Sequence, residues 1–451
     1  MNLILLSGGS GKRLWPLSND ARSKQFLKIL EHQPGHMESM VQRVWRQLLL
    51  CGLAESSIIA TNHTQVDMIR QQLGWDVPIL IEPERRDTFP AIALAATYLY
   101  SVQGVELDEV VVILPVDPYV EDHFFNKLKE LETVLKPSAA HLALMGVRPT
   151  YPSTKYGYIL PELKGGASPY YPVQQFKEKP SEDYAKTLIE DYKALWNCGV
   201  FAFRLEYMIE KLLEKGLPVQ YEQLVKQYHR LPKISFDYEV VERESAIVVL
   251  PYAGEWKDLG TWNTLTEEMD TQLIGNGIVS EDSLNTHLIN ELDIPVVVMG
   301  VSNAVVAVSP DGVLVSDKAS SPKLKDLIRF DHRPMYEESL WGSYRVLDFS
   351  KLENGEEALT RRISLHAGEN FGYQAHFYRV ETWTILSGRG EVILEGEAIP
   401  VKANDVVQIP NGMKHGIRAE EPIVLIEVQI GQIVQEDNVS YQSPWTNVVA
   451  R

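Results

Sequence analysis

A glycine-rich turn directly after the opening apolar run constrains the fold of this chain more than any other feature. Residues 3–6, Leu-Ile-Leu-Leu, are typical of a buried first strand, and residues 7–13, Ser-Gly-Gly-Ser-Gly-Lys-Arg, end it at once. Glycines let the backbone turn tightly and bring its N–H groups close to an anion, while Lys12 and Arg13 add positive charge. The segment therefore predicts a phosphate-binding turn.

Two well-known phosphate-binding loops do not match this segment. The Walker pattern needs a glycine and a Ser or Thr where this chain has Leu6 and Arg13, and the dinucleotide fingerprint needs a glycine in place of Leu14. What remains is Gly-Gly-x-Gly-x-Arg-Leu-Trp-Pro-Leu-Ser, followed by Lys-Gln-Phe-Leu at residues 24–27. This combination strongly resembles the signature of the sugar-phosphate nucleotidylyltransferases, and of the mannose-1-phosphate guanylyltransferases in particular.

The nucleotide is expected beyond the carboxyl ends of the strands, where ligands bind in α/β sheets. The apolar run 79–81 leads into residues 82–88, and we expect Thr88 to cap a helix that Pro90 opens, with backbone donors and Arg86 near the nucleotide. Together with the opening turn, the resemblance implies that the nucleotide is bound by Gly8, Gly9, Gly11, Lys12, Arg13, Glu82, Arg86 and Thr88.

Two aspartates are expected to hold a magnesium ion. Asp117 follows the strand candidate 110–114, and a carboxylate at the mouth of a buried strand is costly unless it meets a cation. The resemblance implies that Asp117 and Asp258 bind Mg²⁺, whose octahedral shell is completed by waters and phosphate oxygens. It also implies that the catalytic residues are Arg13, Lys24 and Lys179, which neutralise phosphate charge.

A third group of motifs points to the sugar phosphate. Gly157 lies in Tyr-Gly-Tyr-Ile, where a glycine lets the backbone approach a hydroxylated ring. Residues 176–180, Phe-Lys-Glu-Lys-Pro, match the family's Glu-Lys-Pro motif, in which Glu178 accepts hydrogen bonds from hydroxyls and Lys179 holds the phosphate. The side-chain amide of Asn197 can donate one hydrogen bond while it accepts another. The resemblance therefore implies substrate binding by Gly157, Glu178, Lys179 and Asn197.

Apolar runs alternate with amphipathic stretches from residue 1 to about 265, as in a sheet covered by helices on both faces. Strands are expected at 58–61, 79–81, 110–114 and 142–146, and helices at 37–50, 65–73, 90–100 and 124–135. We predict an α/β, Rossmann-like nucleotidyltransferase domain with a mostly parallel sheet over residues 1–265. Residues 266–332 resemble the family's small β-rich segment, which often contributes to a dimer contact, so a homodimer is expected.

The C-terminal piece, residues 333–451, alternates strands and turns and predicts a small antiparallel barrel. Residues 374–383 and 409–415 resemble the two halves of a cupin, as in the phosphomannose isomerase domain fused to bifunctional guanylyltransferases. His376, Glu381 and His415 could form a site for a divalent transition metal. However, Tyr378 stands where this family has a second metal histidine, so a structural or catalytically lapsed cupin is favoured over a working isomerase.

Charge and hydropathy limit the partners. The chain has 43 basic and 61 acidic residues, a net charge of −18, and such a surface repels nucleic acid and anionic membranes. No stretch approaches the twenty apolar residues of a membrane span, and the opening residues lack the shape of a signal peptide. We therefore expect a cytoplasmic enzyme without nucleic-acid or membrane partners.

The resemblance implies transfer of a nucleotidyl group from GTP to α-D-mannose 1-phosphate, giving GDP-mannose and pyrophosphate with Mg²⁺. Two alternatives within the enzyme class stay open. One is another base or sugar 1-phosphate, because Asp87, Phe89 and Lys155 depart from the family pattern, and the other is additional isomerisation of mannose 6-phosphate and fructose 6-phosphate. A non-enzymatic alternative is a paralogue that senses sugar nucleotides.

Overall fold

The structure is a computed structural model that describes residues 1–9, 13–19, 22–163, 169–328, 333–434, 437–442 and 445. The predicted nucleotide ligands Gly11 and Lys12 lie outside these ranges. The chain divides into two compact units. The first contains Met1–Leu14 and Ser23–Asp270, and the second contains Trp15–Arg22 and Thr271–Arg451.

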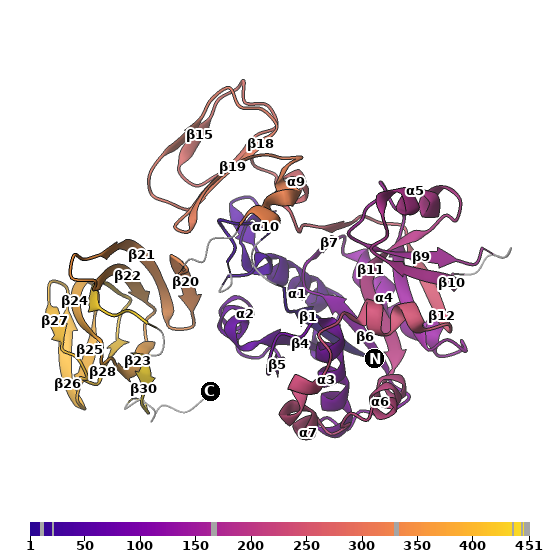
Figure 1. The fold of residues 1–451 in the computed structure, drawn as a ribbon, viewed down its shortest axis with the longest axis horizontal. Helices are drawn as coiled ribbons and strands as arrows, with labels where there is room; N and C mark the ends of the chain where they lie inside the picture. The colour runs from indigo at the N-terminus through magenta and orange to yellow at the C-terminus, as the bar shows by residue number, and fades with distance from the viewer. Residues whose placement is uncertain are drawn as a thin grey trace. The chain divides into compact units, whose positions relative to one another are not determined.

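A nine-stranded mixed sheet forms the centre of the first unit (Figure 1), in the order β5-β4-β1-β6-β11-β8-β12-β10-β9. The pairs joining β5, β4, β1 and β6 are parallel, whereas β11 runs antiparallel to both of its neighbours β6 and β8. The parallel pairing that we expected therefore joins β5, β4, β1 and β6 and is found again between β8 and β12. The strands are β1 (Asn2–Ser7), β4 (Ser57–Asn62), β5 (Ile79–Glu82), β6 (Val110–Pro115), β8 (Leu142–Val147), β9 (Gly157–Pro161), β10 (Tyr171–Glu178), β11 (Leu195–Arg204) and β12 (Ile247–Tyr252).

Helices cover both faces of this sheet because the apolar side chains of β1 alternate between them. Leu3 and Leu5 belong to one buried core with residues of α1, α2 and α4, while Ile4 belongs to the other with residues of α3, α6 and α7. The helices of this unit are α1 (Met40–Leu50), α2 (Val66–Leu73), α3 (Thr88–Ser101), α4 (His123–Leu135), α5 (Glu182–Glu190), α6 (Leu205–Glu214), α7 (Tyr221–Lys226), α8 (Phe236–Glu239) and α9 (Trp262–Glu267).

Two expected helix starts differ from the structure. The helix expected from residue 37 begins at Met40, because Ser39 forms a capping box with Gln42 and residues 36–38 form a strand. The expectation that Thr88 caps α3 is wrong. Asp87 is the cap, and its carboxylate accepts a hydrogen bond from the Thr88 N–H at 2.8 Å.

The second unit begins with a small β-rich part. Its four-stranded sheet has the order β14-β16-β18-β19, and β15 pairs with β17 beside it. The strands are β14 (Leu273–Ile274), β15 (Gly277–Val279), β16 (His287–Asn290), β17 (Val296–Val298), β18 (Ala304–Ser309) and β19 (Gly312–Asp317), and a short helix α10 (Leu324–Leu327) follows. Residues 15–22, which lie between Arg13 and Lys24 in the sequence, belong to this unit rather than to the first.

The C-terminal part consists of two facing antiparallel sheets around one apolar core that includes Trp383 and Ile417. The first sheet contains β20 (Tyr336–Ser339), β21 (Gly342–Lys351), β22 (Glu357–Leu365), β29 (Ile423–Gly431), β24 (Arg379–Ser387) and β27 (Val406–Ile409). The second contains β26 (Glu397–Lys402), β25 (Arg389–Leu394), β28 (His415–Ala419), β23 (Asn370–Ala375) and β30 (Val439–Ser440). The α/β class with a C-terminal antiparallel β domain is thus confirmed, while the three-domain division at residues 265 and 332 stays a prediction.

Within the described ranges, none of the helices has the length and apolar character needed to cross a membrane.

Candidate active site

Two adjoining cavities lie at the carboxyl ends of β1 and β6 in the first unit. The first has a volume of about 310 Å³ and the second about 320 Å³. They share Gly9, Pro115, Asp117, Gly199 and Asp237 in their walls. A pair of connected spaces of this size, lined by charged groups, suits a ligand with two parts.

Lys24 and two aspartates form the charged floor of the first cavity. The Lys24 ammonium lies 2.8 Å from Asp117 Oδ2 and 3.0 Å from Asp258 Oδ1. Burial opposes the charge on Lys24, but the two carboxylates outweigh it and raise the pKa of the ammonium. Burial likewise opposes ionisation of Asp258, and the Lys24 charge outweighs it, so the pKa of that carboxyl is lowered. Lys24 and Asp258 are therefore both ionised near neutral pH.

Strand pairing explains why two aspartates so distant in sequence meet. The short strand β13 (Trp256–Asp258) pairs antiparallel with β7 (Pro118–Val120), and Asp258 lies opposite Pro118. Asp258 therefore lies beside Asp117, the residue immediately before β7. Gly260 permits this arrangement, because a Cβ there would lie 2.9 Å from Asp258 Oδ1.

The aspartate pair fits Mg²⁺ in donor chemistry. Each carboxylate uses one oxygen for Lys24 and keeps the other, and the side chains of Asp117 and Asp258 are 28% and 30% exposed. Mg²⁺ prefers such oxygen ligands and retains several waters or phosphate oxygens. Arg13 also lines this cavity and adds a cation close to the carboxylates.

The second cavity contains every described residue of the predicted nucleotide set except Arg13. Gly8, Gly9, Glu82, Arg86 and Thr88 line it. Glu82 is buried, and the Tyr228 hydroxyl donates to its Oε2 at 2.8 Å. Burial raises the pKa of Glu82 to about 6, so the group is still mostly a carboxylate at neutral pH. Arg86 is held by the Leu231 carbonyl at 2.7 Å.

Residues expected to bind sugar lie at the other end of the first cavity. Gly157 and Glu178 face each other in the β9–β10 pairing, and a Cβ on Gly157 would lie 2.5 Å from Phe176 Cζ. Glu178, Gly157 and Asn197 line the cavity. Lys179 pairs with Glu178 at 2.5 Å, but its half-exposed side chain is not part of either cavity wall.

Asp237 is a site residue that sequence reasoning missed. Its Oδ1 accepts a hydrogen bond from Asn197 Nδ2 at 3.0 Å, and it lines both cavities. Burial, and then the negative charge of Glu178, raise the pKa of Asp237 to about 7. The sequence offered no clear signal for it, because a single aspartate without a recognisable ligand spacing assigns no role to its carboxylate.

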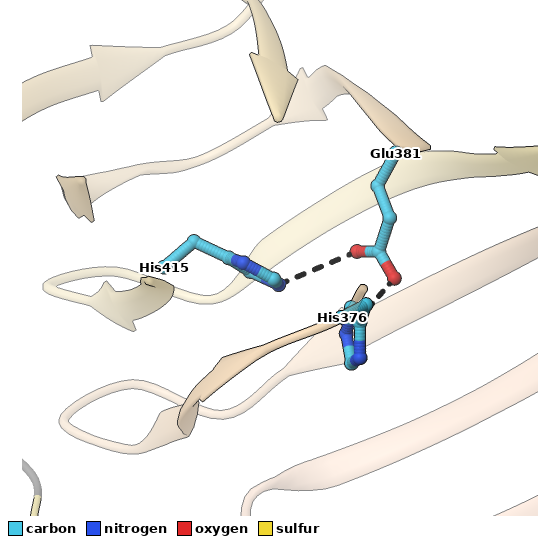
Figure 2. Close-up of side chains that lie close together, drawn as sticks. All are labelled: His376, Glu381 and His415. Carbon is cyan, nitrogen blue, oxygen red and sulfur yellow. Dashed lines mark ion pairs between the residues drawn. The ribbon is translucent and has the colours of Figure 1, made fainter. Parts of the chain in front are cut away.

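A second cluster of metal-ligand residue types lies in the cupin-like domain (Figure 2). One ligand atom from each of His376, Glu381 and His415 lies within 4.8 Å of the other two, and all three residues are buried. His415 Nδ1 lies 2.9 Å from the Met413 carbonyl, and His376 Nδ1 lies 3.4 Å from the Asp437 carbonyl. Carbonyls only accept, so each Nδ1 is placed to donate, while Nε2 of His376 lies 3.1 Å and Nε2 of His415 lies 3.5 Å from an oxygen of Glu381.

Arg379 already supplies a cation to this second cluster. Its Nη2 donates to His376 Nε2 at 3.0 Å, and its Nε donates to Glu381 Oε1 at 3.2 Å. A metal would need the same His376 nitrogen. The donor types therefore suit a transition metal, but a metal does not fit while Arg379 holds this position. His415 Nε2 is the buried atom of the cluster left without a hydrogen-bond partner.

A mixed sheet with charged side chains gathered at its strand ends, joined to a cupin-type domain, is typical of a nucleotide-binding enzyme of two parts. Residues 2–273 match the family model described as nucleotidyl transferase, and residues 328–442 match the one described as mannose-6-phosphate isomerase C-terminal. The chain belongs to the nucleotidyl transferase family and is a nucleotidyltransferase enzyme.

Relatives are similar over nearly the whole chain. The xanthan biosynthesis protein XanB of Xanthomonas campestris pv. campestris is 30% identical over 97% of this chain and 97% of its own length. The mannose-1-phosphate guanylyltransferase RfbM of Salmonella typhimurium is 29% identical over 98% of each chain. The crystal structure of a protein named mannose-1-phosphate geranyltransferase from Thermus thermophilus has a TM-score of 0.60 and 29% identity, and covers 73% of this chain and 98% of that one.

Proposed function

We propose that the protein transfers a guanylyl group from GTP to α-D-mannose 1-phosphate, giving GDP-mannose and pyrophosphate with Mg²⁺. The observation that carries the proposal is the cluster of Lys24, Asp117 and Asp258 at the junction of two cavities, with Arg13 beside it. Two substrates that each carry phosphate have to meet at one charged point, and such a junction offers that point.

Phosphate groups would be neutralised by cations on this chain. The sugar 1-phosphate is already ionised near neutral pH, so attack on the α-phosphate of the nucleotide needs no general base. Arg13 and Lys24 would stabilise charge at the reacting phosphates, and Asp117 and Asp258 would hold Mg²⁺. When bound, Mg²⁺ would neutralise phosphate oxygens and orient them. Lys179 would leave Glu178 to hold the sugar phosphate, a short movement for its half-exposed side chain.

Glu82 supports guanine as the base. A carboxylate at the end of the second cavity accepts two hydrogen bonds, and guanine presents adjacent N1–H and N2–H donors on one edge. Uracil and cytosine do not present such a donor pair, and adenine has an acceptor at N1. Asp87 and Phe89, which depart from the family pattern, do not remove this acceptor.

The experiment measures pyrophosphate release by the purified full chain with each nucleoside triphosphate and with mannose 1-phosphate, glucose 1-phosphate or galactose 1-phosphate. We expect GTP with mannose 1-phosphate to give the highest kcat/KM, and excess EDTA to abolish turnover. A higher kcat/KM with another pair of substrates would show that the proposed base or the proposed sugar is wrong. Nucleotide-sugar binding without turnover by any pair would support the sensor alternative instead.

For the cupin-like domain we propose a structural role. Arg379 satisfies His376 Nε2 and Glu381 Oε1, two of the atoms that a catalytic metal would require. An assay with mannose 6-phosphate and fructose 6-phosphate, with and without added Zn²⁺ or Co²⁺, tests this role. Metal-dependent interconversion would show a working isomerase. The homodimer stays a prediction that size measurement in solution can check.

A further inference from the structure

One buried glutamine, Gln65, contacts both the glycine turn after β1 and the segment that carries Lys24. It is fully buried, and it lines neither of the two cavities. It lies after β4, at the residue that precedes α2. Because this side chain does not reach the cavities, it can affect a bound ligand only through the residues that it contacts.

The oxygen of the Gln65 amide accepts hydrogen bonds from the end of β1 and from the residue after Lys24. Ser7 Oγ donates to Gln65 Oε1 at 3.0 Å, and Gln25 Nε2 donates to the same oxygen at 3.2 Å. Thr61 Oγ1 lies 3.0 Å from this oxygen and 3.0 Å from the Ser7 carbonyl. These four side chains are all buried, so water does not compete for their hydrogen bonds.

The nitrogen of the Gln65 amide faces the glycine turn. Ser23 Oγ donates its only proton to the Gly9 carbonyl at 3.0 Å. Gln65 Nε2 donates to Ser23 Oγ at 2.9 Å and lies 3.4 Å from the Gly9 carbonyl. Both of these oxygens can only accept from Gln65, so the orientation of the amide follows from its partners.

Ser23 contributes its side chain to this network rather than to the helical turn that follows it. It occupies the N-cap position of the turn Lys24–Phe26, where a serine oxygen usually accepts from a backbone N–H. Its side chain makes no such bond to the described turn. The two neighbours of Lys24 in the sequence, Ser23 and Gln25, are therefore held by the same amide, one at its nitrogen and one at its oxygen.

We propose that Gln65 is a positioning residue for nucleotidyl transfer: its amide fixes the Gly9 backbone and Lys24 relative to each other. The inference rests on the proposed role of Lys24. Gly9 lines both cavities and Lys24 lines the first. Since phosphoryl transfer depends on the placement of charge, a shift of about 1 Å can lower the rate by about 100-fold. All members of the network belong to the first unit, so this placement is set within one compact unit.

The experiment compares Gln65→Met with Gln71→Met in the full-length protein, using the substrate pair with the highest kcat/KM. Methionine has a similar length, adds no charge and removes both ends of the amide. Gln71 is exposed on α2 and lines neither cavity, so Gln71→Met is the matched control and should keep the wild-type kcat. We expect Gln65→Met to lower kcat by about 10- to 100-fold, with the KM for sugar 1-phosphate changed less than about twofold.

A second variant, Ser23→Ala, removes the link between the amide and the Gly9 carbonyl from the other side. It leaves the hydrogen bonds to Gln65 Oε1 in place. We expect Ser23→Ala to lower kcat as well, and the double variant with Gln65→Met to lose much less than the product of the two single losses. Losses that multiply in full would show that the two residues act independently, and would overturn the inference.

Equal kcat values for Gln65→Met and Gln71→Met would also overturn the inference, and so would a lower melting temperature for Gln65→Met with kcat unchanged. If Gln65→Met does not fold, Ser23→Ala is read by the same criteria. Lys24→Ala separates the two proposals. Full activity of Lys24→Ala would refute the proposed site, whereas loss of activity there with a normal kcat for Gln65→Met would refute only the positioning role.

Discussion

The two charged clusters of this protein use similar residues with opposite outcomes. Around Lys24, the side chains of Asp117 and Asp258 are 28% and 30% exposed and border a cavity of about 310 Å³. In the cupin-like domain, Glu381 is 2% exposed and lies among two histidines and Arg379. Both clusters pair their carboxylates with a cation of the protein, Lys24 in the first and Arg379 in the second, but the first cluster also borders a cavity with room for ligand charges.

The comparison shows that the types of residue in a cluster do not by themselves determine whether it binds a ligand. Acidic and basic residues that meet at an open cavity can neutralise the charge of a ligand that enters it, as a site for phosphates requires. The same residue types enclosed in a barrel have to be balanced within the protein, because an unpaired buried charge is costly. A list of ligand-type residues therefore predicts a site only when space for the ligand comes with it.

The largest expected effect tests the open cluster. We expect Asp117→Ala to lower turnover by about 1,000-fold or more without unfolding, because a carboxylate of the proposed Mg²⁺ site is lost. Arg13→Ala should have an effect of similar size. Pyrophosphate release measures both effects. The control is Asp76→Asn, because Asp76 is exposed and lies outside both cavity walls. Unchanged release by either variant would refute that residue's assignment.

The second prediction tests the closed cluster. We expect Arg379→Met to reduce the stability of the cupin-like domain by about 3 kcal/mol, because it leaves the buried Glu381 without its neutralising cation. Nucleotidyl transfer per folded molecule should not change. Thermal unfolding and pyrophosphate release measure the two effects. If Zn²⁺ restores stability to Arg379→Met but does not affect the wild type, the arginine and a metal compete for the same atoms. Wild-type stability without Arg379 would contradict the comparison.

The third prediction concerns Glu82 and pH. Its pKa is about 6 in the folded protein and near its ordinary value of 4.5 when unfolded, so ionisation penalises folding by about 2 kcal/mol above pH 6. The penalty disappears below about pH 4.5, where both states are protonated. We therefore expect Glu82→Gln to melt higher than wild type at pH 8 and to lose that advantage at pH 4. If Glu82 recognises guanine, the same variant should raise the KM for GTP. A variant that is less stable at pH 8 would contradict the proposed cost of burial.

The sequence indicated much of the fold and part of the site, with limits that have physical causes. Asp117 and Asp258 could be named from their motifs, yet the β7–β13 pairing that joins them is not visible in either motif. Asp237 was missed because its role depends on contact with Asn197, forty residues away. The path of Trp15–Arg22 into the second unit was also beyond prediction, since its partners Glu291 and Asp311 come nearly three hundred residues later.

The smallest expected effect refines the open cluster at its sugar end. In Gly157→Ala, the new methyl would meet Phe176 Cζ at 2.5 Å and Glu178 Oε2 at 2.6 Å, so these side chains have to move. We expect Glu178 to be displaced and kcat/KM for sugar 1-phosphate to fall by about tenfold, with the KM for the nucleotide unchanged. Gly35→Ala, in an exposed turn where a Cβ meets nothing within 4 Å, is the control: its φ of +78° adds backbone strain that Gly157→Ala does not have, and we expect both kcat/KM values to stay unchanged. An equal loss for both substrates would mean that Gly157 shapes the whole cavity, and the division into a sugar end and a base end would then be wrong.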